Sequence, residues 1–387
     1  MEKRVFHTKE DPADLRENGV DPVFLLLVLT LLGLGLVMLW SASFPQSEYD
    51  SGYTESTRYL RKQAVCALLG LGGMAAFSRL DVGLWRKYAW HIYIIAIALL
   101  MAVLVVGRSV NGAKRWVTIG GIQFQPSEIA KFAVILVFAR LSRAYGPRAE
   151  EFRYGVLGFG TALMGILVPL ALEKHLSAIL LIGMVAVVMM FLSGTRMKFL
   201  MLGAALAGAF VVVYITFMGY AGDRVTAWLD PNSDPSDTGY QILQSLYAIG
   251  SGGIFGLGFG RSRQKYLYLP FQYNDYIFAI VCEELGLFGA AGIMALFAAL
   301  ILRGYHIALK ARDRFSSMLA AGLITLMAVQ TVLNLCVVTN LLPSTGIALP
   351  FFSYGGTALA VNLGEMGVIL GISRQREMPK LQEEEML

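Results

Sequence analysis

The sequence predicts an all-α integral membrane protein, a bundle of ten transmembrane helices with a long extracytoplasmic loop between the seventh and the eighth. Hydrophobic residues make up 56% of the 387 residues and charged residues only 15%, and the mean hydropathy is +0.60. Apolar stretches close to the ~20 residues that a helix needs to cross a bilayer recur from about residue 23 to residue 373. Because lipid offers backbone amides no hydrogen bonds, each stretch must be a helix.

Short polar segments separate the apolar stretches and set their bounds. The predicted spans are 23–43, 60–78, 88–107, 126–142, 154–172, 176–193, 197–218, 274–302, 316–341 and 355–373. Residues 1–22 and 374–387 are predicted as tails. The longest polar segment, 219–274, is too short for a separate domain and is predicted to be a loop with short helices at most.

Loop charge predicts the orientation. With the N-terminus in the cytoplasm, most of the Lys and Arg residues fall in the inner loops, which are also the shorter ones. Both termini are then cytoplasmic and the number of helices is even. The net charge of +5 is scattered through these loops, which favours topology and lipid headgroups over nucleic acid. The three cysteines and four histidines lack ligand spacing and predict neither disulfides nor a zinc site.

Several basic residues depart from this pattern because they lie on the predicted outer side. Arg61 and Lys62 stand at the mouth of the second helix, and Lys114 and Arg115 lie in the loop 108–127. An anion on the outer face is the simplest reason for such residues. Lys114 and Arg115, followed by a tryptophan, are equally compatible with an interfacial anchor belt.

The segment from residue 111 to residue 131 places an ion pair at membrane depth. Pro126 suits the first turn of a helix, and Glu128 and Lys131 are three residues apart, hence neighbours on one helix face. A charge at membrane depth costs ~2.5–3.5 kcal/mol, so neither is expected to be unpaired. The pair either only neutralises itself or marks a site.

Glycines concentrate between residues 250 and 260, and basic residues follow at once. Successive amides in such a stretch can form an anion-binding nest. A re-entrant segment that folds back on itself also needs glycines, and this pattern favours that alternative.

Asp275 lies where the long loop enters the eighth predicted helix, beside aromatic residues. It is either a helix cap or a carboxyl with a raised pKa, as a general base requires. Glu283 and Glu284 lie about two turns deeper; only Glu283 is near the Asp275 face, and it is predicted to be the structural partner of a buried cation. The Pro- and Gly-rich segment 341–357 predicts a broken backbone that lines a cavity or is buried in protein.

Four of these segments together resemble the SEDS family of peptidoglycan glycosyltransferases (FtsW, RodA and SpoVE), and the closing region is most similar to FtsW and SpoVE. The resemblance runs from about residue 25 to residue 374. The matching stretches are NGAKRW with QPSEIAK, QSLYAIGSGGIFGLGFG, YLP with NDYIFAIVCEELG, and LPSTGIALPFFSYGG with ISR.

The resemblance implies roles for individual residues. It makes Asp275 the essential outer-face acid, Glu128 and Lys131 the intramembrane pair, and Arg115 and Lys62 basic residues near the lipid-substrate cavity. Lys114, Arg61 and Lys131 are further predicted contacts for a pyrophosphate. Gln125, Glu283 and Ser353 are predicted supporting residues, and no metal ligand is predicted.

Two departures from the family pattern matter. Phe271 stands where the family usually has Glu after Leu-Pro, so a second acid is absent there. Glu173-Lys174-His175 stands where Gln-Pro-Asp is common, which leaves the function of that outer turn open.

The implied reaction is polymerisation of lipid II, undecaprenyl-pyrophosphate-linked disaccharide-pentapeptide, at the outer face of the bacterial cytoplasmic membrane. Asp275 would act as the base, and the cations or a divalent ion (Mg²⁺ or Mn²⁺) would stabilise the leaving group. The implied partners are a class B penicillin-binding protein and other divisome or elongasome membrane proteins. The alternatives are a lipid II flippase and a non-catalytic scaffold that recruits a penicillin-binding protein.

Overall fold

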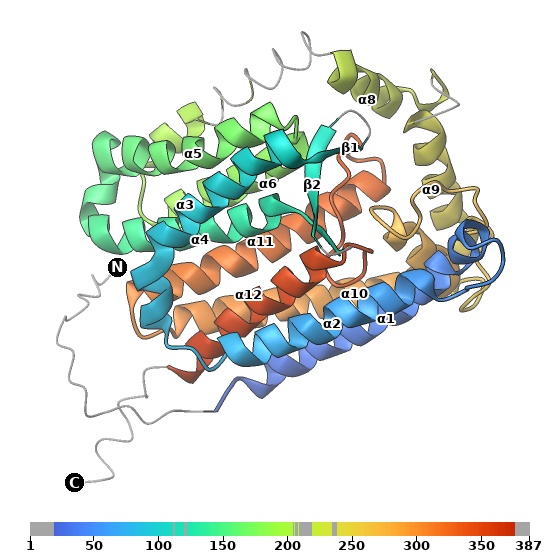
Figure 1. Cartoon of the computed structure of the whole chain (residues 1–387), viewed down its shortest axis with the longest axis horizontal. Coiled ribbons are helices and arrows are strands. Elements are labelled where there is room, and N and C mark those ends of the chain that lie inside the picture. Colours follow the sequence, from blue (N-terminus) through green and yellow to red (C-terminus); the bar gives the residue numbers. More distant parts are fainter. Residues whose placement is uncertain are drawn as a thin grey trace.

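The structure, a computed structural model, describes residues 19–110, 113–119, 122–203, 205, 208, 219–233 and 238–375. It is a mostly helical bundle with a small sheet and two short helices gathered at one end (Figure 1). The longer helices are α1 (Pro22–Asp50), α2 (Arg58–Phe77), α3 (Val82–Val106), α4 (Pro126–Tyr145), α5 (Phe159–Leu172), α6 (Leu176–Leu192), α10 (Ile277–Leu309), α11 (Arg314–Val338) and α12 (Thr357–Arg374). The shorter elements are η2 (Gly146–Glu150), η3 (Arg153–Gly158), α8 (Gly219–Leu229), η4 (Pro231–Ser233) and α9 (Thr238–Gly252).

These helices overlap nine of the ten predicted spans. Of the tenth, 197–218, the structure describes helix from residue 197 to residue 203, while residues 209–218 lie outside the described residues. Five helical stretches among the described residues are long and apolar enough to cross a membrane: α1, α3, the stretch Arg153–Leu172, α10 and α11. The chain is therefore a multi-pass membrane protein.

Helices α4 and α11 form the centre of the bundle (Figure 1). Nearly every residue of α4 from Pro126 to Ser142 is buried, and 72% of the apolar window of α11 is buried. Helices α3, α5, α6, α10 and α12 pack on one or both of these two, while α1 and α2 pack on α10 and α12. The outer helices turn apolar residues outward, as expected where the solvent is lipid. Polar groups can remain in such a core only if they are paired.

The predicted loop 108–127 is largely a three-stranded antiparallel sheet. Strands β1 (Arg108–Val110), β2 (Ala113–Ile119) and β3 (Ile122–Phe124) pair in the order β1-β2-β3. Asn-Gly and Gly-Gly stand between the strands in the sequence, dipeptides typical of tight hairpins. The expectation of an all-α chain was wrong at this point, because the strands are too short to show a clear alternation.

The first and last described segments of the membrane domain meet at one end of the bundle. The backbone amide of Asp21 donates to the Ser373 hydroxyl at 3.0 Å. Arg303, near the end of α10, forms an ion pair with Asp21 at 2.9 Å. Asp275 precedes the other end of α10, so it lies at the opposite end of the bundle.

Helix α10 is broken at Gly286, and the glycine segment before Asp275 closes the break. Gly286 has φ 67° and ψ −168°. The amides of Leu257 and Gly258 donate to the carbonyls of Glu283 and Glu284 at 2.9 and 3.0 Å. These amides therefore satisfy a broken helix inside the protein, which agrees with a re-entrant segment and not with an anion-binding nest there.

Candidate active site

Asp275 is half-buried between α10, α11 and the segment 343–356, which connects α11 to α12. Its backbone carbonyl accepts a hydrogen bond from Asn334 Nδ2 at 2.7 Å. Its carboxylate lies against Gly346, where an added Cβ would come within 3.8 Å of Oδ2. Gly346 has φ +70°, so a side chain is disfavoured there on conformational grounds as well.

The carboxyl group of Asp275 does not cap α10. The helix begins at Ile277, its N-cap residue is Tyr276, and no side chain caps it. Burial raises the pKa of Asp275 to about 6, although its own backbone amide and Arg224 favour the charged form. A carboxyl group with this pKa is mostly ionised at neutral pH and can still accept a proton readily, as a general base requires.

Arg224 favours the charged form of Asp275, and no sequence motif pointed to this arginine. It comes from α8, in the long loop, and its Nη1 donates to the Ser344 carbonyl at 2.9 Å. Trp228, one turn later, donates from Nε1 to the Asn340 carbonyl at 3.0 Å. These bonds dock α8 on the chain that follows α11. The one available signal in the sequence was an arginine in a loop already rich in polar residues.

Of the predicted broken segment 341–357, residues 343–356 are irregular and most of them are buried or half-buried, whereas Leu341 is exposed. The Ser353 hydroxyl accepts from the Leu349 amide at 2.7 Å, which closes a turn. Gln63 of α2 is fully buried. Its Nε2 donates to the Ser353 carbonyl at 3.1 Å, and its Oε1 accepts from the Gly356 amide at 3.0 Å. Ser353 thus has supporting contacts, and Gln63 ties this part of the segment to α2.

The predicted pairing of Glu128 and Lys131 is confirmed. Their side chains are 2.7 Å apart and nearly buried, and Pro126 occupies the first turn of α4 as predicted. Glu365 of α12 is also buried and interacts electrostatically with both residues. Lys131 therefore interacts with two carboxyl groups in the core. A pair whose only role is to neutralise its own charges would not need the second carboxyl group.

The turn between α5 and α6 packs over this pair. The Arg115 guanidinium donates to the Lys174 carbonyl at 2.5 Å, and Gln125 Nε2 lies 3.4 Å from His175 Nε2. Burial raises the pKa of Glu173 to about 8, although Arg115 favours its charged form. Burial, with Arg115 and Lys131, lowers the pKa of His175 to about 3. Both shifts favour the uncharged forms of the two turn residues, which limits the charge beside the cations.

The turn and the Asp275 site are joined through the segment 343–356. The Ser177 hydroxyl, at the start of α6, donates to the Thr345 carbonyl. The next residue, Gly346, is the one against which the Asp275 carboxylate lies. The structure therefore brings Arg115, Gln125 and Lys131 to the same end of the bundle as Asp275.

The remaining predicted basic residues are placed differently. Arg61 forms an ion pair with Glu55 at 2.7 Å, and its side chain is 61% exposed. Lys62 is also exposed. Their helix adjoins the Asp275 segment, since the rings of Tyr59 and Tyr273 lie 4.6 Å apart. The side chain of Lys114 lies outside the described residues.

The prediction that Glu283 is the partner of a buried cation was wrong by one residue. Lys265 Nζ pairs with Glu284 at 2.9 Å, with both side chains buried, and Ser41 hydrogen-bonds to both of them. Glu283 instead accepts from the Ser262 hydroxyl at 2.5 Å and the Arg263 amide at 2.9 Å. Through these contacts both glutamates fix the loop that leads to Asp275.

Metal ligation is not apparent in the described part of the chain. There, no group of three or more His, Cys, Asp or Glu side chains is arranged to hold a metal ion.

Comparison with known proteins identifies the family. The family model for cell cycle proteins of the FtsW, RodA and SpoVE type matches residues 22–378. The chain belongs to this family. It is 39% identical over 357 residues to a protein of Geobacter sulfurreducens named probable peptidoglycan glycosyltransferase FtsW, covering 91% of this chain and 95% of that protein. It is 37% identical to stage V sporulation protein E of Bacillus subtilis, covering 93% and 98%. The peptidoglycan glycosyltransferase MrdB of Escherichia coli is also 37% identical, with 93% and 95% covered.

Solved structures agree with this family fold. One match is a chain with a TM-score of 0.76 and 27% identity, covering 93% of this chain and 99% of that chain. Its structure is described as "Structural coordination of polymerization and crosslinking by a peptidoglycan synthase complex". The rod shape determining protein RodA of Thermus thermophilus matches with a TM-score of 0.69 and 26% identity, covering 93% and 98%. The resemblance to this family noted in the sequence is thereby confirmed.

Proposed function

We propose that this chain is an inverting peptidoglycan glycosyltransferase that polymerises lipid II on the outer face of the cytoplasmic membrane, in cell division, elongation or sporulation. The observation that carries the proposal is Asp275. It is a half-buried carboxyl group outside the helix that it precedes; burial raises its pKa to about 6, and Arg224 favours its charged form. The names of the FtsW and MrdB relatives support the same reaction.

In the proposed reaction the Asp275 carboxylate removes the proton of the acceptor sugar hydroxyl. The hydroxyl oxygen then attacks the anomeric carbon of the donor sugar, and the bond from that carbon to the lipid diphosphate breaks. The electron pair leaves with the diphosphate, and attack from the opposite side inverts the anomeric centre. A general base contributes typically ~10²–10⁴-fold.

The leaving diphosphate needs positive charge close to the departing oxygen. Arg115 and Lys131, at the same end of the bundle as Asp275, are the proposed buried contacts, and Lys114, Arg61 and Lys62 the proposed outer ones. Arg224 completes the positive side of the site. A divalent ion, if used, would take most of its ligands from the diphosphate, since few carboxylates gather near Asp275 in the described chain.

The finer topology belongs to the same proposal: ten crossings, both termini in the cytoplasm, and residues 219–274 outside. The bond between Asp21 and Ser373 supports it, because two ends that meet on one side need an even number of crossings. Positive charge in the loops at that end supports a cytoplasmic location. A cysteine or a protease cleavage site added at either terminus would test the orientation. A thiol reagent or protease that cannot cross the membrane should reach it only from the cytoplasmic side.

A transpeptidase of the class B penicillin-binding proteins is the proposed partner, with other divisome or elongasome membrane proteins around it. The resemblance to a chain in a peptidoglycan synthase complex that couples polymerization and crosslinking supports this. Co-purification of the full chain with a cognate transpeptidase from a membrane extract would test it.

The decisive experiment compares purified wild-type chain with Asp275→Asn in a lipid II polymerisation assay, alone and with the transpeptidase. Asparagine keeps the shape of aspartate but removes the base, so we expect the rate to fall ~10²–10⁴-fold. Glu55→Gln is the matched control, because Glu55 is another outer carboxylate, paired on the surface with Arg61. Equal rates for wild type and Asp275→Asn would refute the catalytic assignment.

The same variant separates the alternatives. A scaffold would keep its effect on the transpeptidase in Asp275→Asn, and a flippase would move lipid II between the leaflets of a liposome without polymerising it. The crowding of polar groups at the Asp275 end favours the glycosyltransferase, since transport needs a polar path to both faces.

A further inference from the structure

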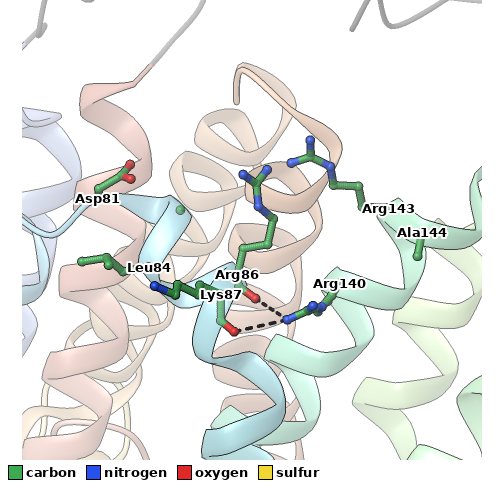
Figure 2. A pocket seen from close by; sticks show the side chains of 8 residues that line it. Asp81, Leu84, Arg86, Lys87, Arg140, Arg143 and Ala144 are labelled. Carbon is green, nitrogen blue, oxygen red and sulfur yellow. Dashed lines mark hydrogen bonds between the residues drawn. The ribbon is translucent and has the colours of Figure 1, made fainter. Parts of the chain in front are cut away.

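A cavity of about 650 Å³ lies at the end of the bundle opposite Asp275. It sits between the first turns of α3 and the last turns of α4 (Figure 2). Asp313, which lies beside the cavity, comes after the C-terminal end of α10, whereas Asp275 comes before its N-terminal end. The cavity and Asp275 are therefore at opposite ends of that helix. The side chains that matter in its lining are Asp81, Leu84, Arg86, Lys87, Arg140 and Arg143.

The cavity holds an excess of positive charge. Asp313 is shared by two of the guanidinium groups, that of Arg143 at 2.7 Å and that of Arg86 at 3.8 Å. Asp81 accepts a hydrogen bond from Gln375 at 3.3 Å. Four cationic side chains therefore stand against two carboxylates, and the cavity keeps a net positive charge. Such a hollow attracts an anion.

Contacts within the protein hold the three arginine side chains in place. Arg140 Nη1 donates to the Arg86 carbonyl at 2.7 Å and to the Lys87 carbonyl at 3.3 Å, which ties α4 to α3 (Figure 2). The guanidinium group of Arg143 extends from α4 toward that of Arg86 on α3 (Figure 2), and both contact Asp313. Arginine groups arranged in this way match the oxygen atoms of a phosphate.

The cavity also adjoins an apolar surface. Leu84, which lines it, is 42% exposed, and Tyr88, one turn further along α3, is 44% exposed. Beyond them α3 exposes Ile94 and Ile95, at 61% and 55%. A molecule with a phosphate in the cavity could lay apolar chains along this face, which a soluble phosphate could not do.

We infer that this cavity binds the phosphate of an anionic phospholipid whose acyl chains run along the exposed face of α3. Membrane topology requires only that basic residues lie somewhere in the inner loops. It does not explain why four of them line one cavity beside an apolar helix face. Basic pockets between helices at a headgroup boundary are a recurrent form of lipid site.

The test measures bound lipid on the full purified chain by native mass spectrometry, with phosphatidylglycerol or phosphatidylcholine added. We expect selective retention of phosphatidylglycerol by the wild type, and an affinity reduced about ten- to thirtyfold in Arg86→Gln/Lys87→Gln. Arg153→Gln/Lys198→Gln is the control. Arg153 and Lys198 are exposed basic residues at the same end of the bundle, outside the cavity.

Three results would overturn the inference. An equal loss in both double variants would mean diffuse surface attraction. Displacement of the lipid by an excess of inorganic phosphate would mean a site for a soluble anion. Equal retention of the two lipids would mean no headgroup selectivity. If the double variant does not fold, Lys87→Gln alone replaces it, because it leaves the Arg86–Asp313 contact intact. We expect this single variant to lower the affinity for phosphatidylglycerol about threefold to fivefold.

Discussion

Asn334 holds Asp275 by its backbone. Its Nδ2 donates to the Asp275 carbonyl at 2.7 Å and to the Ile347 carbonyl at 2.8 Å. Asn334 is fully buried, so one side chain of α11 joins the entry to α10 with the segment 343–356. The position of the Asp275 carboxylate against Gly346 depends on this link.

Replacing Asn334 by leucine should therefore damage both stability and activity. Leucine is similar in size but leaves two buried carbonyls without their donor, at a cost of ~1–3 kcal/mol each. A small shift of the base can cost ~10²-fold in rate. We expect a lower unfolding temperature and at least a tenfold slower polymerisation of lipid II.

Gln330→Leu is the matched control for this prediction. Gln330 lies one turn earlier on α11, and its Nε2 donates at 2.9 Å to the Ala348 carbonyl in the same segment. It has no contact with Asp275 among its described hydrogen bonds. We expect a loss of stability with a smaller loss of rate; equal losses of rate would argue against a positioning role specific to Asn334.

Activity should depend on pH through Asp275. Burial raises the pKa of this group to about 6, and only the ionised form can accept the hydroxyl proton. The rate should therefore be fully developed above about pH 7 and fall as the pH drops through 6. A pH–rate profile of lipid II polymerisation measures this, with unfolding followed at each pH so that loss of structure is not read as titration.

Arg224 should set the midpoint of that profile. It favours the charged form of Asp275, so Arg224→Gln should raise the pKa and move the midpoint to higher pH. Arg224→Lys keeps the charge and should restore most of the wild-type midpoint. A midpoint that does not move in Arg224→Gln would show that the electrostatic contact is unimportant.

The features predicted correctly from the sequence are those that neighbouring residues determine. Nine spans coincide with helices because an apolar stretch of the right length has no other stable form in lipid. Glu128 and Lys131 pair because residues three apart share a helix face. The burial of the segment 343–356 follows in the same way from prolines and glycines within an apolar run.

The features missed depend on contacts between distant residues. Arg224 reaches Asp275 only because α8 docks on the chain after α11. Glu284, not Glu283, meets Lys265, and a helical wheel counted from Asp275 misses this because α10 begins only at Ile277. No local pattern encodes which loop residue faces which helix.

The Lys265–Glu284 pair gives a prediction about stability. Both side chains are buried, at 3% and 0% exposure. Lys265→Met leaves a buried carboxylate without its cation, which costs typically ~3–5 kcal/mol. Lys265→Met/Glu284→Gln removes both charges and should recover much of that loss, as thermal unfolding in detergent would measure.

The exposed pair Arg61–Glu55 is the control for the buried one. Its side chains are 61% and 47% exposed, and such pairs contribute about 0–1 kcal/mol. Arg61→Gln should hardly change the unfolding temperature. If it destabilised the protein as much as Lys265→Met, burial would not be the reason for the larger effect.

The break in α10 gives the last prediction. A Cβ added at Gly286 would lie 2.2 Å from the Gly256 amide nitrogen, and its φ of +67° disfavours any side chain. Gly286→Ala should therefore separate the glycine segment from α10, release the amides of Leu257 and Gly258, and loosen the loop that carries Asp275. We expect a clear drop in unfolding temperature together with loss of polymerisation.

Gly292→Ala provides the comparison within the same helix. A Cβ at Gly292 would meet nothing within 4 Å, and alanine is the better helix former by ~1 kcal/mol. This variant should be as stable as the wild type or more so, with unchanged activity. If both variants behaved alike, the close contact at Gly286 would have no structural role.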